Sequence, residues 1–247
     1  MKNLNKKQII NLPKAVFFDL DNTLYEYQKC HDAGLSAVKL KAEQELSVDK
    51  RTFDKLYIKS NEEVKLNLKG KASSHNKLIY FKNMIEFLEL GSQPVLALNF
   101  EQTYWRTFLN KAILFENVKE LLDEFRIFSI PIIIITDLTT QIQFRKIVHL
   151  ELDEYVDFVI TSEEAGFDKP HPSPFKLAFK KLNFKKETTW MFGDDPVKDI
   201  KGSRDAIGAI TFQKLHSGVK IGTNDSKPDF IFKTFKEVLS FVRNLNA

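Results

Sequence analysis

Asp19 and Asp21 have the types and the spacing of a metal-binding or acid–base pair. They follow a short apolar run, residues 15–18, that is typical of a buried strand. Alternate residues of a strand point the same way, so both carboxylates should emerge together at the strand's carboxyl end, where open α/β sheets bind ligands. Two adjacent carboxylates repel each other, and a hard cation such as Mg²⁺, which prefers oxygen ligands, removes that repulsion. The simpler interpretation is a polar turn, because Asp is a common turn residue.

Polar residues also follow three later apolar runs, each of which predicts a strand. A hydroxyl group at a strand's end can donate to a phosphate oxygen, an ammonium group can hold a carboxylate and a phosphoryl group, and a further carboxylate can bind a cation. Pro170 restricts the backbone of the residue before it, so the ammonium group of Lys169 is expected to be held in place. The positions are Thr136 after residues 130–135, Lys169 after residues 155–160, and Asp194 and Asp199 after residues 188–192.

Together these stretches resemble the four motifs of the haloacid dehalogenase-like (HAD) hydrolase superfamily, in the order that the family has them. Residues 19–23 match D-x-D-x-T, residues 162–172 match S-x-E-x-G-x-x-K-P-x-P, and residues 193–199 match G-D-x-x-x-x-D. Thr136 stands where the second motif of the family has Ser or Thr. The chain is similar to the C1-capped phosphatases of subfamily I from residue 15 to about residue 230.

The resemblance implies a role for each matching residue. Asp19 would attack phosphorus and form an aspartyl-phosphate, and Asp21 would serve as the acid and the base. The other implied roles are phosphate binding by Thr136 and Lys169, Mg²⁺ binding by Asp19, Asp194 and the main-chain carbonyl of Asp21, and orientation of metal-bound water or of Lys169 by Asp199.

Asp137 departs from the family pattern, in which Asn or Gly is common at this position. It would either contact the substrate phosphate, beside Thr136, or cap the helix predicted over residues 139–150. The second interpretation is favoured, because a carboxylate beside an anionic substrate would repel it.

The order of the elements predicts an α/β fold with a Rossmann-like parallel sheet, because strands that alternate with helices pair in parallel through right-handed crossovers. With the strands numbered along the chain, the resemblance implies the spatial order 3-2-1-4-5. The predicted strands are residues 15–18, 130–137, 155–160, 188–192, 207–212 and 229–232, and a closing helix spans 234–245. Residues 1–13 are expected to form a loose polar arm.

Residues 26–111 contain no convincing strand, and their apolar residues recur at helical spacing. Four or five helices are expected there, inserted into a core formed by residues 1–25 and 112–247. The resemblance identifies this insert as an all-helical C1 cap, which would exclude water and select the substrate. An ordinary helical subdomain is the alternative. Arg106 is the cap residue chosen to test for contact with an anionic tail.

Composition restricts the remaining possibilities. The single cysteine, Cys30, rules out an internal disulfide and favours a reducing cytoplasm. The net charge of +4 arises from 37 basic and 33 acidic residues, without a basic stripe, so no nucleic-acid partner is expected. No signal peptide or membrane span is expected either. The sequence does not indicate an oligomeric state.

These observations predict a Mg²⁺-dependent phosphatase that hydrolyses a small phosphorylated metabolite, such as a sugar phosphate, a nucleoside monophosphate or phosphoglycolate. A phosphomutase of the same fold would share every core residue. A non-catalytic binding or regulatory protein is the alternative from another class, and it would be expected to lack one of the motifs. A 2-haloacid dehalogenase is disfavoured, because its chemistry needs no acid two residues after the nucleophile, where Asp21 stands.

Overall fold

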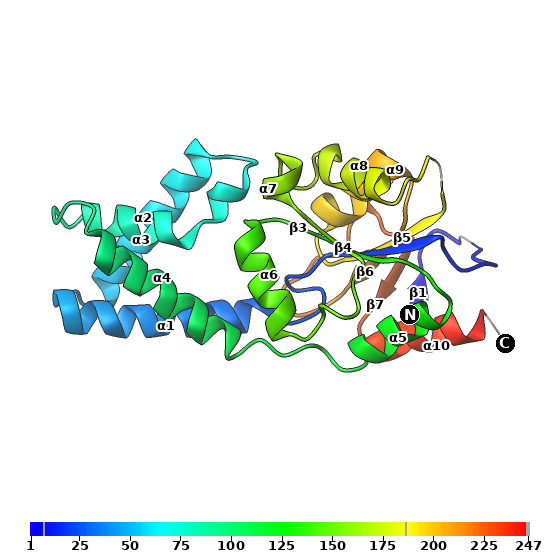
Figure 1. Ribbon diagram of the computed structural model, residues 1–247, viewed down its shortest axis with the longest axis horizontal. Coiled ribbons are helices and arrows are strands. Elements are labelled where there is room, and N and C mark those ends of the chain that lie inside the picture. The colour runs from blue at the N-terminus through cyan, green and yellow to red at the C-terminus, as the bar shows by residue number, and fades with distance from the viewer. Residues whose placement is uncertain (7, 186, 246–247) are drawn as a thin grey trace. The chain divides into compact units, whose positions relative to one another are not determined.

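The computed structural model describes residues 1–6, 8–185 and 187–245 of the chain. Its contacts divide the chain into two compact units (Figure 1). The core unit comprises Met1–Glu26 and Ile113–Ala247, and the helical unit comprises Tyr27–Ala112. Each unit is described by itself.

The core unit is built on a sheet of seven strands in the order β1-β7-β6-β5-β2-β3-β4. The five strands in the middle and at one edge, β4-β3-β2-β5-β6, have the predicted order 3-2-1-4-5. All neighbours are parallel except β1 and β7. The strands are β1 (Lys2–Asn3), β2 (Ala15–Phe18), β3 (Ile132–Thr136), β4 (Phe158–Thr161), β5 (Thr189–Gly193), β6 (Ile210–Lys214) and β7 (Phe230–Phe232).

The prediction of a loose N-terminal arm is wrong at its first residues, which form the antiparallel edge strand β1. Lys2 pairs with Ile231 and Asn3 pairs with Phe230. The main chain of Leu4 also donates to the carbonyl oxygen of Asp229, at 2.8 Å. An edge strand offers unpaired main-chain groups that any sequence can satisfy, so the pairing needs no apolar pattern and escapes a search for one.

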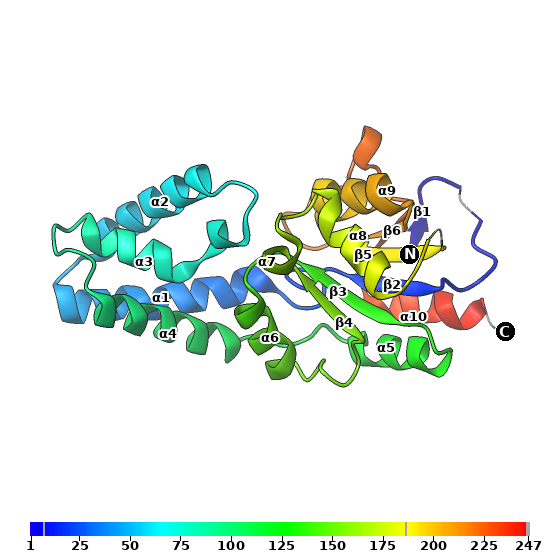
Figure 2. The same ribbon diagram turned by 45° about the horizontal axis from the view of Figure 1, so that its top comes forward.

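The two faces of the sheet carry different packing. One face places residues such as Phe17, Ile133 and Met191 against α8 and α9. The other face is rich in aromatic residues: Phe18 stacks on Phe192 at a ring-centroid distance of 4.7 Å, and both rings contact Phe125 of α5. Figures 1 and 2 show α5 and α10 together on this second face. The helices are α5 (Val118–Ile127), α8 (Pro172–Lys181), α9 (Gly202–Ile207) and α10 (Phe235–Asn244).

Local sequence explains where the core helices begin. The residue before α5, Asn117, has φ 62°, and asparagine tolerates this left-handed backbone better than most residues. Thr234 and Glu237 form a reciprocal capping box at the start of α10. The remaining helical segments of the core unit are α6 (Thr140–His149), α7 (Ser162–Ala165), the π-helical turn η2 (Pro196–Lys201) and the 3-10 turn η3 (Asn224–Ser226).

The helical unit, all of whose residues are described, contains four α-helices and a short 3-10 turn. Gly34 allows α1 and α4 to approach closely, because a Cβ atom there would lie 2.8 Å from the ring of Tyr104. Among the described residues, no helix is long and apolar enough to cross a membrane. The segments of the helical unit are α1 (Tyr27–Leu46), α2 (Lys50–Asn67), η1 (Ala72–His75), α3 (Lys77–Glu86) and α4 (Pro94–Leu109).

Candidate active site

The carboxyl ends of three neighbouring parallel strands bring the sequence-predicted residues to one edge of the sheet. Asp19 directly follows β2, Thr136 ends β3 and Asp194 follows β5. The main-chain N–H of Asp19 donates to the carbonyl oxygen of Phe192 at 2.9 Å, which continues the pairing of β2 with β5 up to the site. The sheet therefore fixes the spacing of these side chains, although they lie far apart in the sequence.

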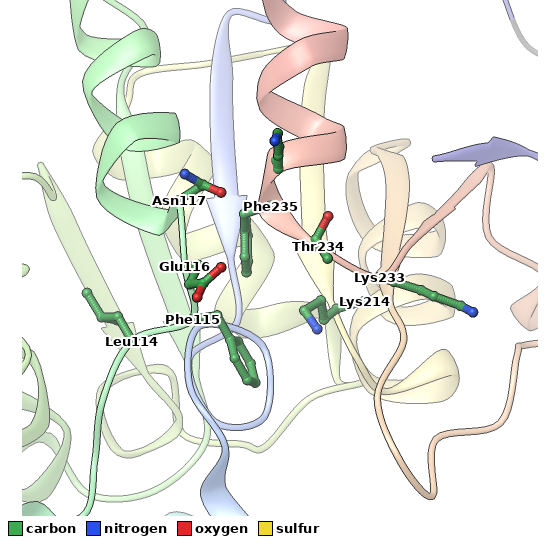
Figure 3. Close-up of a pocket in the computed structure, with 9 residues that line it drawn as sticks. Leu114, Phe115, Glu116, Asn117, Lys214, Lys233, Thr234 and Phe235 are labelled. Atoms are coloured by element: carbon green, nitrogen blue, oxygen red, sulfur yellow. The ribbon is translucent and has the colours of Figure 1, made fainter.

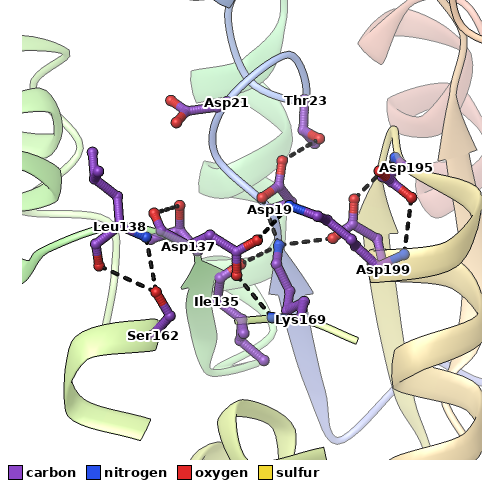
Figure 4. Close-up of polar contacts among 12 residues, drawn as sticks. Asp19, Asp21, Thr23, Ile135, Asp137, Leu138, Ser162, Lys169, Asp195 and Asp199 are labelled. Atoms are coloured by element: carbon purple, nitrogen blue, oxygen red, sulfur yellow. Dashed lines mark hydrogen bonds and ion pairs between the residues drawn. The ribbon is translucent and has the colours of Figure 1, made fainter. Parts of the chain in front are cut away.

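Lys169 is the central cation of this edge (Figure 4). Its Nζ atom donates to Asp19 Oδ1 at 2.6 Å, to Asp199 Oδ1 at 2.7 Å and to the carbonyl oxygen of Ile135 at 2.9 Å. These three acceptors match the three donors of an ammonium group. Burial lowers the pKa of Lys169, but the carboxylates of Asp19 and Asp199 outweigh burial and raise the pKa well above its usual value. Lys169 therefore stays charged in the buried site.

The carboxylates around Lys169 carry more negative charge than this single ammonium group can neutralise. Burial, together with the nearby Asp199, raises the pKa of Asp19 to about 7 although Lys169 opposes the shift. Burial and the nearby Asp194 likewise raise the pKa of Asp199 to about 6, and burial raises the pKa of Asp194. Each shift means that the site favours a proton, or another cation, in addition to Lys169.

Oxygen atoms of Asp19, Asp194 and Asp199 lie within 4.8 Å of one another, so this cluster could hold a metal ion. Carboxylate oxygens suit a hard divalent cation, and the raised pKa values of all three residues fit a site that gains from one. Gly193 is needed here, because a Cβ atom at this position would collide with the carboxyl group of Asp199. The donor set therefore fits the predicted Mg²⁺.

Gln213 of β6 and His216 of the loop after β6, to which the sequence assigned no chemistry, support Asp194. His216 Nε2 lies 3.1 Å from Asp194 Oδ2, and Gln213 Nε2 donates to the carbonyl oxygen of Asp194 at 2.9 Å. The hydrogen bond with Asp194 raises the pKa of His216. The loop after β6 therefore belongs to the site, and it was missed because it carries no recognisable motif.

Asp195 and Asp199 shape the turn after β5. Asp195 caps this turn by accepting from the main-chain N–H groups of Val197 and Lys198. Asp199 Oδ2 accepts from the main-chain N–H of Asp195 at 3.0 Å, while Oδ1 faces Lys169. The turn is π-helical, a form that often occurs at functional sites.

The prediction that Asp137 caps the following helix is wrong. Thr139 occupies the cap position of α6, and no side chain makes the cap hydrogen bond. Asp137 Oδ1 instead accepts from the main-chain N–H of Lys169 at 2.9 Å, and Oδ2 forms an ion pair with Lys198 at 2.9 Å. The carboxylate of Asp137 pairs with the main-chain N–H of Lys169 and the ammonium group of Lys198 in preference to the exposed N-terminus of α6, because both groups lie within hydrogen-bond distance. Its predicted contact with phosphate remains a proposal.

Thr136 is buried and is held by Gln143, a residue of α6 that the sequence did not indicate. Gln143 Nε2 donates to Thr136 Oγ1 at 2.5 Å and to the carbonyl oxygen of Asp137 at 2.6 Å. Within the described part of the chain, the hydroxyl group of Thr136 donates only in a long contact of 3.4 Å, to the same carbonyl oxygen. Thr136 therefore retains the capacity to donate to a ligand oxygen.

Asp21 is held by a second lysine that the sequence did not indicate. Lys146 Nζ, from α6, lies 2.8 Å from Asp21 Oδ1 and 2.7 Å from Oδ2. The hydroxyl group of Tyr25 also donates to Asp21 Oδ1. Figure 4 shows the Asp21 carboxylate directed away from the contact between Asp19 and Lys169. The two aspartates of the first motif thus have separate partners.

Arg106, the residue expected to contact an anionic tail, lies in α4 of the helical unit. Tyr104 and Trp105 are buried in the core of the helical unit, whereas Arg106 is exposed. The hydroxyl group of Tyr104 lies 2.6 Å from His31 Nδ1. Burial and the nearby Lys77 lower the pKa of His31 to about 4, so this imidazole is neutral at physiological pH. The contact of Arg106 with an anionic tail remains a proposal.

A separate pocket of about 430 Å³ lies in the core unit between the starts of α5 and α10 (Figure 3). Lys214, Lys233 and Lys236 line it together with Glu116. Lys214 is largely buried, and its Nζ atom lies 4.4 Å from the centroid of the Phe115 ring. None of the predicted phosphate- or metal-binding residues is among those that line this pocket.

Comparison with known proteins agrees with the motifs. A family model described as haloacid dehalogenase-like hydrolase matches residues 13–206. The chain is 40% identical over 199 residues to the ribulose-1,5-bisphosphate 5-phosphatase of Halopiger xanaduensis, over 80% of this chain and 82% of that protein. It is 29% identical to the glyceraldehyde 3-phosphate phosphatase of Methanocaldococcus jannaschii, over 94% of this chain and 98% of that protein.

The fold also has a counterpart among solved structures. A HAD phosphatase from Thermococcus onnurineus matches with a TM-score of 0.71 at 20% sequence identity, over 92% of this chain and 97% of that one. This likeness concerns the fold alone. From the extent of the family match and of the first relative, the chain belongs to the haloacid dehalogenase-like hydrolase family.

Proposed function

We propose that the protein is a Mg²⁺-dependent phosphatase that hydrolyses a small phosphomonoester through an aspartyl-phosphate on Asp19. The observation that carries the proposal is the buried contact of 2.6 Å between Asp19 and Lys169, beside the carboxylates of Asp194 and Asp199. This arrangement places a nucleophile, a fixed cation and a site for a divalent ion together at the carboxyl ends of the strands.

The first step is attack of an Asp19 oxygen on phosphorus, which breaks the bond to the leaving alcohol. Asp21 gives its proton to that alcohol. In the second step water attacks the aspartyl-phosphate, Asp21 takes a proton from the water, and inorganic phosphate leaves. Lys169 and the hydroxyl group of Thr136 stabilise negative charge on the phosphoryl oxygens.

Mg²⁺ held by Asp19, Asp194 and the main-chain carbonyl of Asp21 would supply positive charge between two approaching anions. Asp199 would orient Lys169, with which it forms an ion pair at 2.7 Å. We place the enzyme in the cytoplasm, because a chain with the single cysteine Cys30 forms no internal disulfide, as is usual for proteins of reducing compartments. The helical unit would act as the cap that selects the substrate.

We further propose that the substrate is a phosphorylated sugar of the size of a triose or pentose. The support is the 40% identity with a ribulose-1,5-bisphosphate 5-phosphatase and the 29% identity with a glyceraldehyde 3-phosphate phosphatase. A phosphomutase of the same fold would return the phosphoryl group to a sugar, so release of inorganic phosphate distinguishes the two activities.

Release of phosphate from 4-nitrophenyl phosphate tests the mechanism, with wild type and Asp19→Asn compared in Mg²⁺ and in a chelator. Activity should require both Asp19 and Mg²⁺. Asp153→Asn is the matched control, because it makes the same change at an exposed position of the core unit. A panel of sugar phosphates then identifies the substrate. If Asp19→Asn retains activity, or the folded wild type with Mg²⁺ releases no phosphate from any compound, the proposal is wrong.

A further inference from the structure

Lys146 lies outside all four motifs, and yet it contacts both carboxylate oxygens of Asp21. Its Nζ atom lies within 2.8 Å of both carboxylate oxygens, so one ammonium group bridges the two. Tyr25 adds a third hydrogen bond, to Oδ1. Lys146 is fully buried, whereas the side chain of Asp21 is 26% exposed. The carboxylate is therefore fixed from the protein side and open on the other.

Burial of Lys146 is not explained by packing. Lysine usually places its methylene groups against apolar surface and leaves the ammonium group in water. An ammonium group that is fully buried costs free energy unless it is paired. Beside Ile142 and Ile147 of α6, packing alone does not require a lysine, because replacing both members of a buried ion pair by apolar side chains of similar volume is often neutral or stabilising. The ammonium group of Lys146 is better explained by its contact with both oxygens of Asp21, which fixes the orientation of that carboxylate.

The direction of the Asp21 carboxylate suits an acid that serves the leaving group. In phosphoryl transfer the attacking and leaving oxygens lie roughly in line, on opposite sides of phosphorus. An acid that protonates the leaving oxygen must therefore stand away from the nucleophile. Figure 4 shows the carboxylate of Asp21 turned away from Asp19. Lys146 holds it there through both oxygens.

We propose that Lys146 is a positioning residue, which holds the Asp21 carboxylate where it can exchange a proton with the leaving alcohol and with water. The inference rests on the proposed phosphatase function and deepens it. It assigns to α6 a part in proton transfer, separate from the stabilisation of phosphoryl charge by Lys169. Loss of Lys146 should therefore slow release of the leaving group only where that group needs a proton, whereas hydrolysis of the aspartyl-phosphate, which is common to all substrates, should slow for each of them. The ratio kcat/KM isolates the first of these steps, because it covers the reaction only up to release of the leaving group.

Two substrates distinguish these contributions. 4-Nitrophenolate leaves without protonation, whereas the alkoxide of a sugar phosphate requires it. In Lys146→Met, kcat/KM for the preferred sugar phosphate should fall by roughly 10²-fold, within the range for a positioned acid or base. The kcat/KM for 4-nitrophenyl phosphate should fall by less than about tenfold, because its leaving group needs no proton. Asp21→Asn should show the same selectivity, and combining the two substitutions should add little.

Arg145→Met is the matched control, because it removes one positive charge from the neighbouring, exposed position of α6. Its kcat should equal that of wild type for both substrates. Thermal unfolding verifies that Lys146→Met is folded, and Lys146→Arg provides a second variant that keeps the charge and should recover part of kcat. In Lys146→Ala, propylammonium should restore turnover of the sugar phosphate, which a purely structural defect would not allow.

An equal loss of kcat/KM for both substrates, an unchanged kcat/KM for the sugar phosphate or a faster turnover in Lys146→Met would each overturn the inference. A faster turnover would mean that Lys146 holds Asp21 in a resting position. These results are distinct from failure of the proposed function. In that case wild type would release phosphate from neither substrate, or Asp19→Asn would remain active.

Discussion

Two buried lysines of the core unit contact the two aspartates of a single loop, and their surroundings differ. Lys169 lies between the carboxylates of Asp19 and Asp199, in a cluster with an excess of negative charge. Lys146 contacts Asp21, which water can reach, and lies on a helix whose other buried residues include Ile142 and Ile147. Lys169 thus balances the charge of the carboxylates around it, whereas Lys146 fixes the orientation of the Asp21 carboxylate. Removal of each lysine should have different consequences.

The largest effect is expected for Lys169→Met, which removes the central cation of the site. Loss of one group that stabilises transition-state charge costs roughly 10²–10³-fold in kcat. This loss should be similar for 4-nitrophenyl phosphate and for the sugar phosphate, in contrast to Lys146→Met, because phosphoryl charge develops with either leaving group. Steady-state kinetics on both substrates measures the contrast.

Stability should separate the two lysines as well. Breaking a buried ion pair by removing one partner costs about 3–5 kcal/mol, and Lys169→Met leaves Asp19 and Asp199 without their cation. Lys146→Met should be milder, because Asp21 reaches solvent. Lys181→Met is the control, since its ion pair with Glu164 is largely exposed. Equal destabilisation of the Lys146 and Lys169 variants in urea would contradict the comparison.

The same contrast explains how much of the site could be predicted from sequence. Asp19, Lys169 and Asp194 stand next to strands or prolines, so short local patterns reveal them, and the parallel sheet brings them together. The five strands β2 to β6 were predictable for the same reason, because β-branched and aromatic runs mark them. The antiparallel β1 was not, because an edge pairing through the main chain leaves no pattern of side chains.

Gln143 and Lys146 were missed because their signal is helical. They belong to a buried stripe of α6, with Ile142 and Ile147, whose spacing of three and four residues is that of an inward helix face. Two polar residues in an inward stripe must find partners, which Thr136 and Asp21 provide. The sequence could have indicated that partners exist. It could not have named them, because they lie in other elements.

A smaller effect is expected at Asp137, which acts on Lys169 through its main chain. Asp137 Oδ1 accepts from the N–H group of Lys169, and Lys198 holds Oδ2. A hydrogen bond to a charged group contributes about 1.5–3 kcal/mol, of which only a part should affect the position of Lys169. Asp137→Ala should therefore reduce kcat by roughly tenfold, and Lys198→Met should reduce it less.

Asp137→Asn distinguishes this role from direct contact with phosphate. The amide oxygen can still accept from the N–H group of Lys169, so activity should largely remain. If the carboxylate instead lies against the substrate and repels it, Asp137→Asn should lower KM. The fold-change in KM should then exceed the fold-change in kcat that Asp137→Ala causes. Kinetics of the two variants with the same sugar phosphate decides between these roles.

The smallest effect concerns pH, and it measures the excess negative charge around Lys169 directly. The pKa of Asp19 rises from 3.8 to about 7 on folding, so the folded protein holds this proton more tightly than the unfolded chain. Its contribution to stability is thus fully present below about pH 4 and is lost as the pH rises through about 7. Asp199, whose pKa rises to about 6, acts in the same direction.

Urea unfolding in chelator should therefore show a decline of stability between pH 5 and pH 8 that is smaller in Asp19→Asn than in wild type. Saturating Mg²⁺ should reduce the decline, because the cation replaces the lost protons. Asp153→Asn, which makes the same change at an exposed position outside this cluster, is the matched control. A decline of equal size in wild type and Asp19→Asn would mean that the cluster around Lys169 does not carry the excess charge assigned to it.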